Sequence, residues 1–321
     1  MKSPNKLQVG DEIRVIAPSR SVKILSEEGI VKAQSNLEKL GFKVTFGKNI
    51  EVCDLQNSSS IEERIADLHD AFKDPNVKGI LTVIGGFNSN ELLPYLDYEL
   101  IQNNPKILCG FSDVTALATA IYTKCGFITY SGPHFSSFGM EGLQAYQTKF
   151  FQQALMNDTP FLLEASEQWS DDAWYIDQEN RIYEAGEWKV YSEGEATGHL
   201  IGGNLCTLNL LQGTEYMPDL DNSILFVEDD ELIDPQLFAR DLTSLLQIEG
   251  NIKGLLIGRF QNVSKVTKEQ LYFILDKHPL LQQIPVMYDI DFGHTQPILT
   301  LPIGGEVHVD TKNRQIKLLA F

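Results

Sequence analysis

The stretch Lys106-Ile-Leu-Cys-Gly-Phe-Ser-Asp-Val-Thr-Ala-Leu-Ala-Thr-Ala-Ile-Tyr122 reads as a short apolar strand, a turn and a helix in direct succession. Residues 106–109 are typical of a buried strand and residues 114–122 of a helix, so Ser112 is predicted at the corner between them. A serine in this position points its hydroxyl away from the sheet, beside the N–H groups that start the helix. Ser112 is therefore a candidate hydrolase nucleophile; the alternative is a serine that only caps the helix.

The same alternation of strands and helices extends over the first half of the chain. Strands are predicted at residues 12–17, 42–46 and 79–84, and helices at residues 26–40, 61–72 and 90–96. Nearly continuous apolar strands separated by helices favour a parallel sheet covered on both faces. Ligands of such sheets bind beyond the carboxyl ends of the strands, where the Gly85-Gly86 loop and the Ser112 turn are both expected.

We predict an α/β protein with an N-terminal doubly wound parallel sheet domain and a mixed, β-rich C-terminal α/β domain. The expected division is residues 1–150, a connecting segment 151–194 and residues 195–321. The connecting segment holds all three tryptophans and shows no helix or strand period from residue 150 onward, so it is interpreted as a binding lid or as a linker packed on either domain. Residues 198–204 read as a glycine-containing loop, and residues 306–319 as a closing hairpin.

Composition excludes several classes of function. The 321 residues carry 26 Lys and Arg against 44 Asp and Glu, a formal charge of -18, so a nucleic-acid partner is not expected. No run approaches the roughly 18 apolar residues of a membrane span, and the first residues do not resemble a signal peptide, so a cytoplasmic protein is expected. The four cysteines lack Cys-x-x-Cys spacing, which argues against disulfides and thiolate zinc; Cys109 is interpreted as a core residue and not as a second nucleophile.

A nucleophilic serine needs a base and a group that orients the base. His294, on a glycine-bearing loop after the predicted strand 286–290, is the favoured base, whereas His134 and His199 lie in predicted loops as possible substrate contacts. Glu228, where an apolar strand runs into carboxylates, is the candidate orienting acid. The alternatives are a solvated loop that caps the next helix, and a divalent cation held by Glu228, Asp229, Asp230 and His294.

Six segments together resemble the LD-carboxypeptidase family of serine peptidases. They are residues 84–90 (IGGFNSN), 105–117 (PKILCGFSDVTAL), 131–135 (SGPHF), 198–205 (GHLIGGNL), 225–229 (LFVED) and 291–297 (DFGHTQP). The resemblance implies a triad of Ser112, Glu228 and His294 in an interdomain cleft and an oxyanion hole at the backbone of Gly86 and Asp113. It also implies a homodimer and no cofactor or metal.

Within this family the sequence looks similar to the microcin C immunity-type branch, which cleaves the amide between a peptide or amino acid and a nucleotide-like tail. The resemblance implies a small peptide or peptidyl-nucleotide substrate. The expected substrate-binding residues are Phe87, Asn88, His134, Trp169, Trp174 and Asn204, with the tryptophans stacking on a nucleobase. A family member that removes D-alanine from cell-wall tetrapeptides, a metal hydrolase and a non-enzymatic binder of a nucleotide-like ligand are the alternatives.

Overall fold

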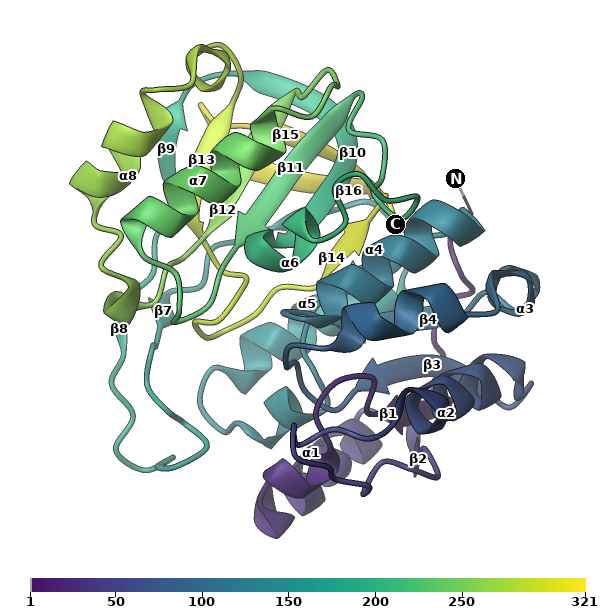
Figure 1. The fold of residues 1–321 in the computed structure, drawn as a ribbon. Helices are drawn as coiled ribbons and strands as arrows, with labels where there is room; N and C mark the ends of the chain where they lie inside the picture. Colours follow the sequence, from purple (N-terminus) through teal and green to yellow (C-terminus); the bar gives the residue numbers. More distant parts are fainter. Residues whose placement is uncertain (1) are drawn as a thin grey trace.

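The computed structural model describes residues 2–321, which form two lobes, each built around its own sheet (Figure 1). The N-terminal sheet has the order β14-β5-β4-β3-β1-β2. Five of its strands run parallel, and β14, from far along the chain, pairs antiparallel with β5. The strands are β1 (Glu12–Ile16), β2 (Lys43–Phe46), β3 (Val77–Thr82), β4 (Ile107–Gly110), β5 (Thr129–Ser131) and β14 (Leu301–Ile303).

Helices cover both faces of this sheet because its strands are apolar on both sides. One face packs against α2, α3 and α4, and the other against α1 and α5, in two separate groups of buried side chains. Ser60 and Glu63 form a capping box that fixes the start of α2. The helices are α1 (Glu27–Lys39), α2 (Ile61–Lys73), α3 (Tyr98–Asn103), α4 (Val114–Cys125) and α5 (Gln144–Met156), with the 3-10 turns η1 (Val22–Ile24), η2 (Ser89–Tyr95) and η3 (Ser136–Gly139).

The C-terminal sheet is mixed, with the order β6-β16-β15-β10-β11-β12-β13-β9. Its central strands β10 to β13 are parallel, and antiparallel strands extend it at both sides. The strands are β6 (Phe161–Leu163), β9 (Lys189–Ser192), β10 (Glu195–Asn204), β11 (Ser223–Glu228), β12 (Gly254–Gly258), β13 (Val286–Ile290), β15 (Glu306–Asp310) and β16 (Gln315–Ala320). The remaining elements are α6 (Leu205–Asn209), α7 (Pro235–Leu246), α8 (Lys268–Leu275), η4 (Asn262–Ser264), η5 (Pro279–Gln282) and the small pair β7 (Gln168–Trp169) and β8 (Glu184–Ala185). The predicted α/β class, with a parallel and a mixed sheet, is confirmed.

Two local predictions are wrong. The sequence predicts no regular period around residue 150, yet α5 runs from Gln144 to Met156; its buried face includes a polar residue, Gln147, which obscures the helical pattern. Residues 198–204 are predicted as a loop that presents His199, but they belong to β10. The glycines suggest a loop, whereas the backbone of β10 is held by ladders to β11 and β15 on its two sides.

The two lobes meet where α4 lies against α6 and the end of β10 (Figure 1). The backbone N–H of Asn204 donates to Thr115 Oγ1 over 3.0 Å, which ties the end of β10 to the first turn of α4. This contact lies three residues from Ser112, so the nucleophile candidate is placed at the junction of the lobes. None of the helices in residues 2–321 has the length and apolarity needed to cross a membrane.

Candidate functional site

Ser112 lies in the tight turn between β4 and α4, as the sequence predicts. Its φ of 61° is in the left-handed region, which costs a residue with a side chain roughly 1–3 kcal/mol. Gly85, in the loop three residues after the end of the neighbouring β3, makes room for this turn: a Cβ there would lie 2.9 Å from Ser112 Cβ and 3.0 Å from Oγ. The strained turn lifts the hydroxyl out of the sheet, which is the geometry that exposes a nucleophile.

His294 and Glu228 come from the other lobe and reach Ser112. His294 Nε2 lies 3.0 Å from Ser112 Oγ, and His294 Nδ1 lies 2.7 Å from Glu228 Oε2. Glu228 is the last residue of β11 and is 3% exposed, so the sheet holds it rigidly. Gly293, with a φ of 105°, allows the loop to pass Glu228, because a Cβ there would be 2.7 Å from Oε2. The structure thus connects the three residues in the order serine, histidine, glutamate.

Electrostatics favour the base role of His294. Burial lowers the pKa of His294, but the charge and hydrogen bond of Glu228 outweigh burial and raise it above the usual 6.5. Burial and the charge of Glu228 raise the pKa of the adjacent Asp229 to about 7. In contrast, burial lowers the pKa of His134 to about 3, so this second histidine is neutral and cannot serve as a cationic group at neutral pH.

The loop after β3 is fixed to the Ser112 turn through Asp113. The carboxylate of Asp113 accepts hydrogen bonds from Ser19 Oγ at 2.6 Å and from the backbone N–H groups of Asn88 and Ser89 at 3.1 and 2.9 Å. These bonds hold the loop of Gly85 and Gly86 against the Ser112 turn, with Gly85 next to Ser112 and Gly86 next to Ser19 and Arg20. In residues 2–321, the backbone N–H groups of Gly86 and Asp113 donate to no backbone carbonyl, so both are free for a ligand oxygen.

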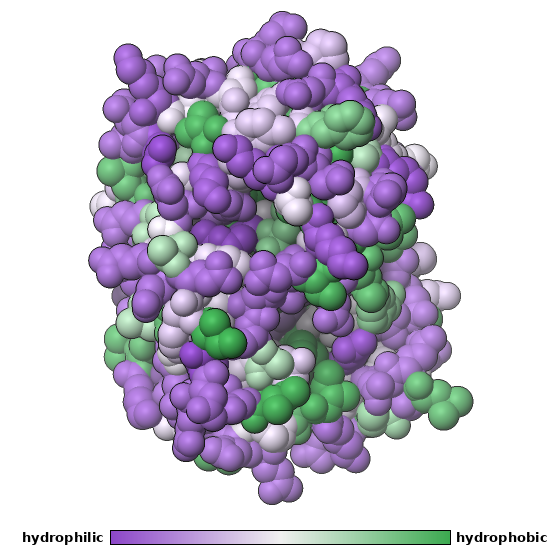
Figure 2. All heavy atoms as spheres, turned by 90° about the vertical axis from the view of Figure 1, so that its left-hand side faces the viewer, coloured by the Kyte–Doolittle hydropathy of each residue, from purple (hydrophilic) through white to green (hydrophobic). Residues whose placement is uncertain are grey.

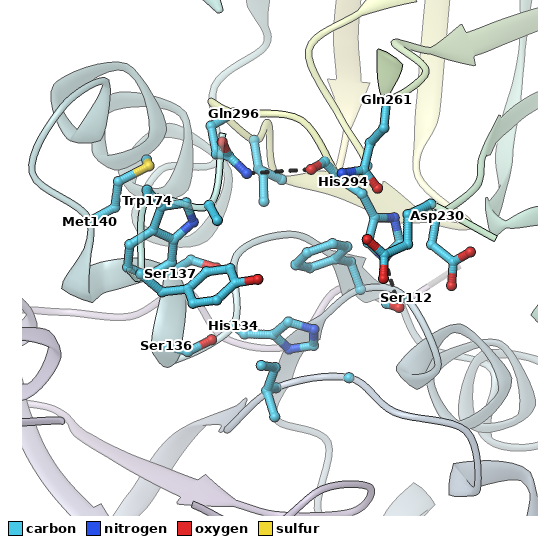
Figure 3. A pocket seen from close by; sticks show the side chains of 18 of the residues that line it. Ser112, His134, Ser136, Ser137, Met140, Trp174, Asp230, Gln261, His294 and Gln296 are labelled. Carbon is cyan, nitrogen blue, oxygen red and sulfur yellow. Dashed lines mark hydrogen bonds between the residues drawn. The ribbon is translucent and has the colours of Figure 1, made fainter. Parts of the chain in front are cut away.

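A cavity of about 380 Å³ opens over Ser112 and His294 (Figure 3). Of the sequence-predicted contacts, it is lined by Phe87, His134 and Trp174. Phe87 is 65% exposed, whereas His134 is buried in the wall, where its Nδ1 lies 2.6 Å from Thr82 Oγ1. Viewed from the side on which the connecting segment lies, the surface is mainly hydrophilic, with apolar side chains in separate groups (Figure 2).

The other three predicted contacts do not line this cavity. Trp169 is expected on an exposed lid, but it is 8% exposed and lies against the guanidinium of Arg259, 4.8 Å from the ring centre. Asn204 caps α6 by accepting from the backbone N–H of Thr207. Asn88 is 9% exposed in the loop held by Asp113. Their surroundings therefore favour structural roles.

The sequence reasoning missed Asp291, a fully buried carboxylate at the start of the His294 loop. Arg259 Nη1 donates to it over 2.7 Å, and Trp188 Nε1 and the backbone N–H of Ser166 donate over 2.8 Å each. Its own backbone carbonyl accepts from Leu299 N–H at 2.8 Å, which closes the loop at its base. Asp291 thereby fastens the loop to both the C-terminal sheet and the connecting segment.

The carboxylates after β11 do not gather around a common point. Asp234 caps α7, and Asp230 accepts from the backbone N–H of Leu232. In the part of the chain that the structure describes, residues 2–321, no group of three or more His, Cys, Asp or Glu side chains is placed to hold a metal ion. The geometry gives no support to the metal-hydrolase alternative. Cys109 is fully buried, and burial raises the pKa of its thiol, as expected for a core cysteine.

Both lobes match domains of one known protein family. Residues 13–132 match the LD-carboxypeptidase N-terminal domain, and residues 197–309 match the LD-carboxypeptidase C-terminal domain. A putative carboxypeptidase of Bacillus subtilis (strain 168), YocD, is 50% identical over 309 residues and covers 95% of each chain. The microcin C7 self-immunity protein MccF of Escherichia coli is 33% identical over 328 residues, covering 97% of this chain and 94% of that protein.

Solved structures show the same similarity. An MccF-like protein from Bacillus anthracis (strain Ames) superimposes with a TM-score of 0.98 at 50% identity, over 100% of both chains. MccF in complex with glutamyl sulfamoyl guanosine superimposes with a TM-score of 0.90 at 31% identity, over 99% of this chain and 98% of that one.

Proposed function

Because the chain belongs to the LD-carboxypeptidase family of serine peptidases, we propose that it hydrolyses an amide bond through Ser112, His294 and Glu228. The observation that carries this proposal is the pair of contacts at His294, 3.0 Å to Ser112 Oγ and 2.7 Å to Glu228 Oε2. A serine hydroxyl is a poor nucleophile without a base, and the base must be held in one tautomer. These two contacts supply both requirements.

The positions of these atoms support the following reaction. His294 Nε2 removes the proton of Ser112 Oγ as the oxygen attacks the amide carbonyl. The N–H groups of Gly86 and Asp113 stabilise the oxyanion of the tetrahedral intermediate. His294 then protonates the leaving nitrogen, and water hydrolyses the acyl-enzyme by the reverse sequence. Glu228 accepts the Nδ1 hydrogen and stabilises the imidazolium form in both halves of the reaction.

We favour a peptide or aminoacyl-nucleotide as the substrate. MccF, which shares the fold at 31% identity, has been solved with an aminoacyl sulfamoyl nucleoside. Trp174 is half-buried and Phe87 is exposed, and both aromatic rings line the cavity. Such rings can pack against a nucleobase or a peptide side chain. Removal of D-alanine from a cell-wall tetrapeptide is the second candidate, because the family description names LD-carboxypeptidases.

Incubation of the protein with both substrate types, followed by mass spectrometry of the products, tests this function. We expect cleavage of at least one amide, and a loss of several orders of magnitude in turnover for Ser112→Ala with substrate binding retained. Ser136→Ala is the matched control, since Ser136 lines the same cavity outside the triad. Equal turnover in Ser112→Ala and the wild type would overturn the proposal.

Three further expectations remain predictions. They are the division of the chain at residues 150 and 194, the cytoplasmic location and the homodimer that the family resemblance implies. Sedimentation or light scattering of the purified protein measures the last of them.

A further inference from the structure

Arg20 is a cation in the cavity that the proposed chemistry does not use. It follows β1, at the carboxyl end of the N-terminal sheet, where ligands of such sheets bind. Its guanidinium lies 5.2 Å from the ring centre of Phe87, and a Cβ on Gly86 would be 3.0 Å from Arg20 Cγ. Arg20 is therefore a direct neighbour of the loop that contributes to the oxyanion hole.

The backbone before Arg20 is held firmly. Ser19 Oγ donates to the Asp113 carboxylate at 2.6 Å, and the carbonyl of Ser19 accepts from Ser58 Oγ at 2.6 Å. Pro18 O accepts from Arg64 Nη1 at 3.3 Å. The base of the Arg20 side chain is thus fixed relative to the Ser112 turn.

Arg20 differs from every other arginine in residues 2–321 because it has no carboxylate partner. The other six all form ion pairs: Arg14, Arg64, Arg181, Arg240, Arg259 and Arg314. In a chain with 44 acidic and 26 basic residues, carboxylates are abundant, so an arginine without one is unusual. The unpaired cation is also the one that lines the cavity above the nucleophile.

Another part of the cavity wall carries the opposite charge. Asp230 lies beside His294 (Figure 3), and Glu231 lines the cavity next to it. No ion pair within residues 2–321 joins Asp230 or Glu231 to a lysine or arginine. An anionic ligand group would be repelled from this wall and attracted to Arg20. The charge distribution therefore orients a ligand that is negative at one end.

We propose that Arg20 binds an anionic group of the substrate, a carboxylate or a phosphate-type group, next to the scissile amide. This inference rests on the proposed function and deepens it. A guanidinium forms paired hydrogen bonds with either group, so it suits the terminal carboxylate of a peptide as well as the phosphoryl-type linker of an aminoacyl-nucleotide. Arg20 would make the enzyme selective for amides that carry such a negative charge.

Binding to the Ser112→Ala protein, measured by calorimetry, tests this without turnover. The probes are two matched pairs: a tetrapeptide with its terminal carboxylate or carboxamide, and an aminoacyl-nucleotide with its phosphoramidate or with a 5′-amino-5′-deoxynucleoside that lacks phosphate. We expect the charged member of at least one pair to bind about 10–100-fold more tightly, and Ser112→Ala/Arg20→Gln to lose that preference. The pair that responds identifies the source of the anion.

Arg240→Gln in the same background is the control, because Arg240 is exposed and outside the cavity. An unchanged preference in the Arg20→Gln protein, an equal loss for charged and neutral probes, or no binding of any probe would overturn the inference. Hydrolysis by the protein with an intact Ser112 reports on the proposed function separately. If the wild-type protein cleaves its substrate but Arg20→Gln leaves the charge preference unchanged, only the role of Arg20 is overturned.

Discussion

Gly85→Ala should disable the proposed nucleophile, Ser112, without unfolding the protein. The new Cβ would lie 2.9 Å from Ser112 Cβ and 3.0 Å from Oγ. Carbon atoms pack at about 3.5–4.0 Å, so the serine or the loop must move by roughly 0.5–1 Å. A displacement of about 1 Å at a reacting atom costs on the order of 10²-fold in rate. Overpacking of a buried site costs about 1–3 kcal/mol of stability.

The assay measures kcat for an amide that the wild-type protein cleaves, together with the thermal unfolding of each variant. Gly126→Ala is the matched control: Gly126 has a φ of 72° at the end of α4, and a Cβ there would meet no atom within 4 Å. It should lose about 1–2 kcal/mol from backbone strain and keep its turnover. If Gly85→Ala and Gly126→Ala retain equal turnover, the packing of Gly85 against Ser112 does not position the nucleophile and the reasoning is refuted.

Three other changes follow from the same geometry. Glu228 raises the pKa of His294, and the base must be neutral, so kcat/KM should fall as the pH drops through a value above 6.5. Glu228→Gln should shift this acidic fall in kcat/KM to lower pH and reduce the maximal rate by roughly 10⁴-fold; an unshifted pH profile would contradict the role of Glu228. Asp291→Asn should lower the free energy of unfolding by about 3–5 kcal/mol, because the substitution leaves the buried Arg259 without its ion-pair partner. A loss below about 1 kcal/mol in a denaturant titration would contradict this expectation. Trp174→Ala should raise KM for a nucleotide-bearing substrate by about 5–150-fold, whereas Trp169→Ala should lower the free energy of unfolding by about 3 kcal/mol. The reverse pattern would show that Trp169, and not Trp174, faces the substrate.

The sequence predicts the parts of the site that depend on local order along the chain. A strand, a turn and a helix around Ser112 indicate the corner, and the apolar run before Glu228 indicates that this carboxylate ends a rigid strand. His294 is favoured only modestly by its glycine loop. The family resemblance, carried by six segments, is what joins these three distant residues into one expected triad.

The parts that sequence reasoning misses depend on partners distant in the chain. In the sequence Asp291 is not distinguishable from the other acidic loop residues. Its burial is explained by the hydrogen bonds that Arg259, Trp188 and Ser166 donate to its carboxylate. Trp169 and Trp174 are five residues apart in one polar segment, yet Arg259 covers the first and the second reaches the cavity. No periodicity distinguishes them, because Trp169 is buried by Arg259, a residue 90 positions further along the chain.

Labelling with a fluorophosphonate, followed by peptide mapping, tests the central claim most directly. The reagent phosphonylates a serine only where a neighbouring base activates the hydroxyl. We expect a single adduct on Ser112 and its loss in His294→Ala, because His294 Nε2 is 3.0 Å from the hydroxyl. An adduct on another serine, no adduct at all, or wild-type labelling of His294→Ala would contradict the account.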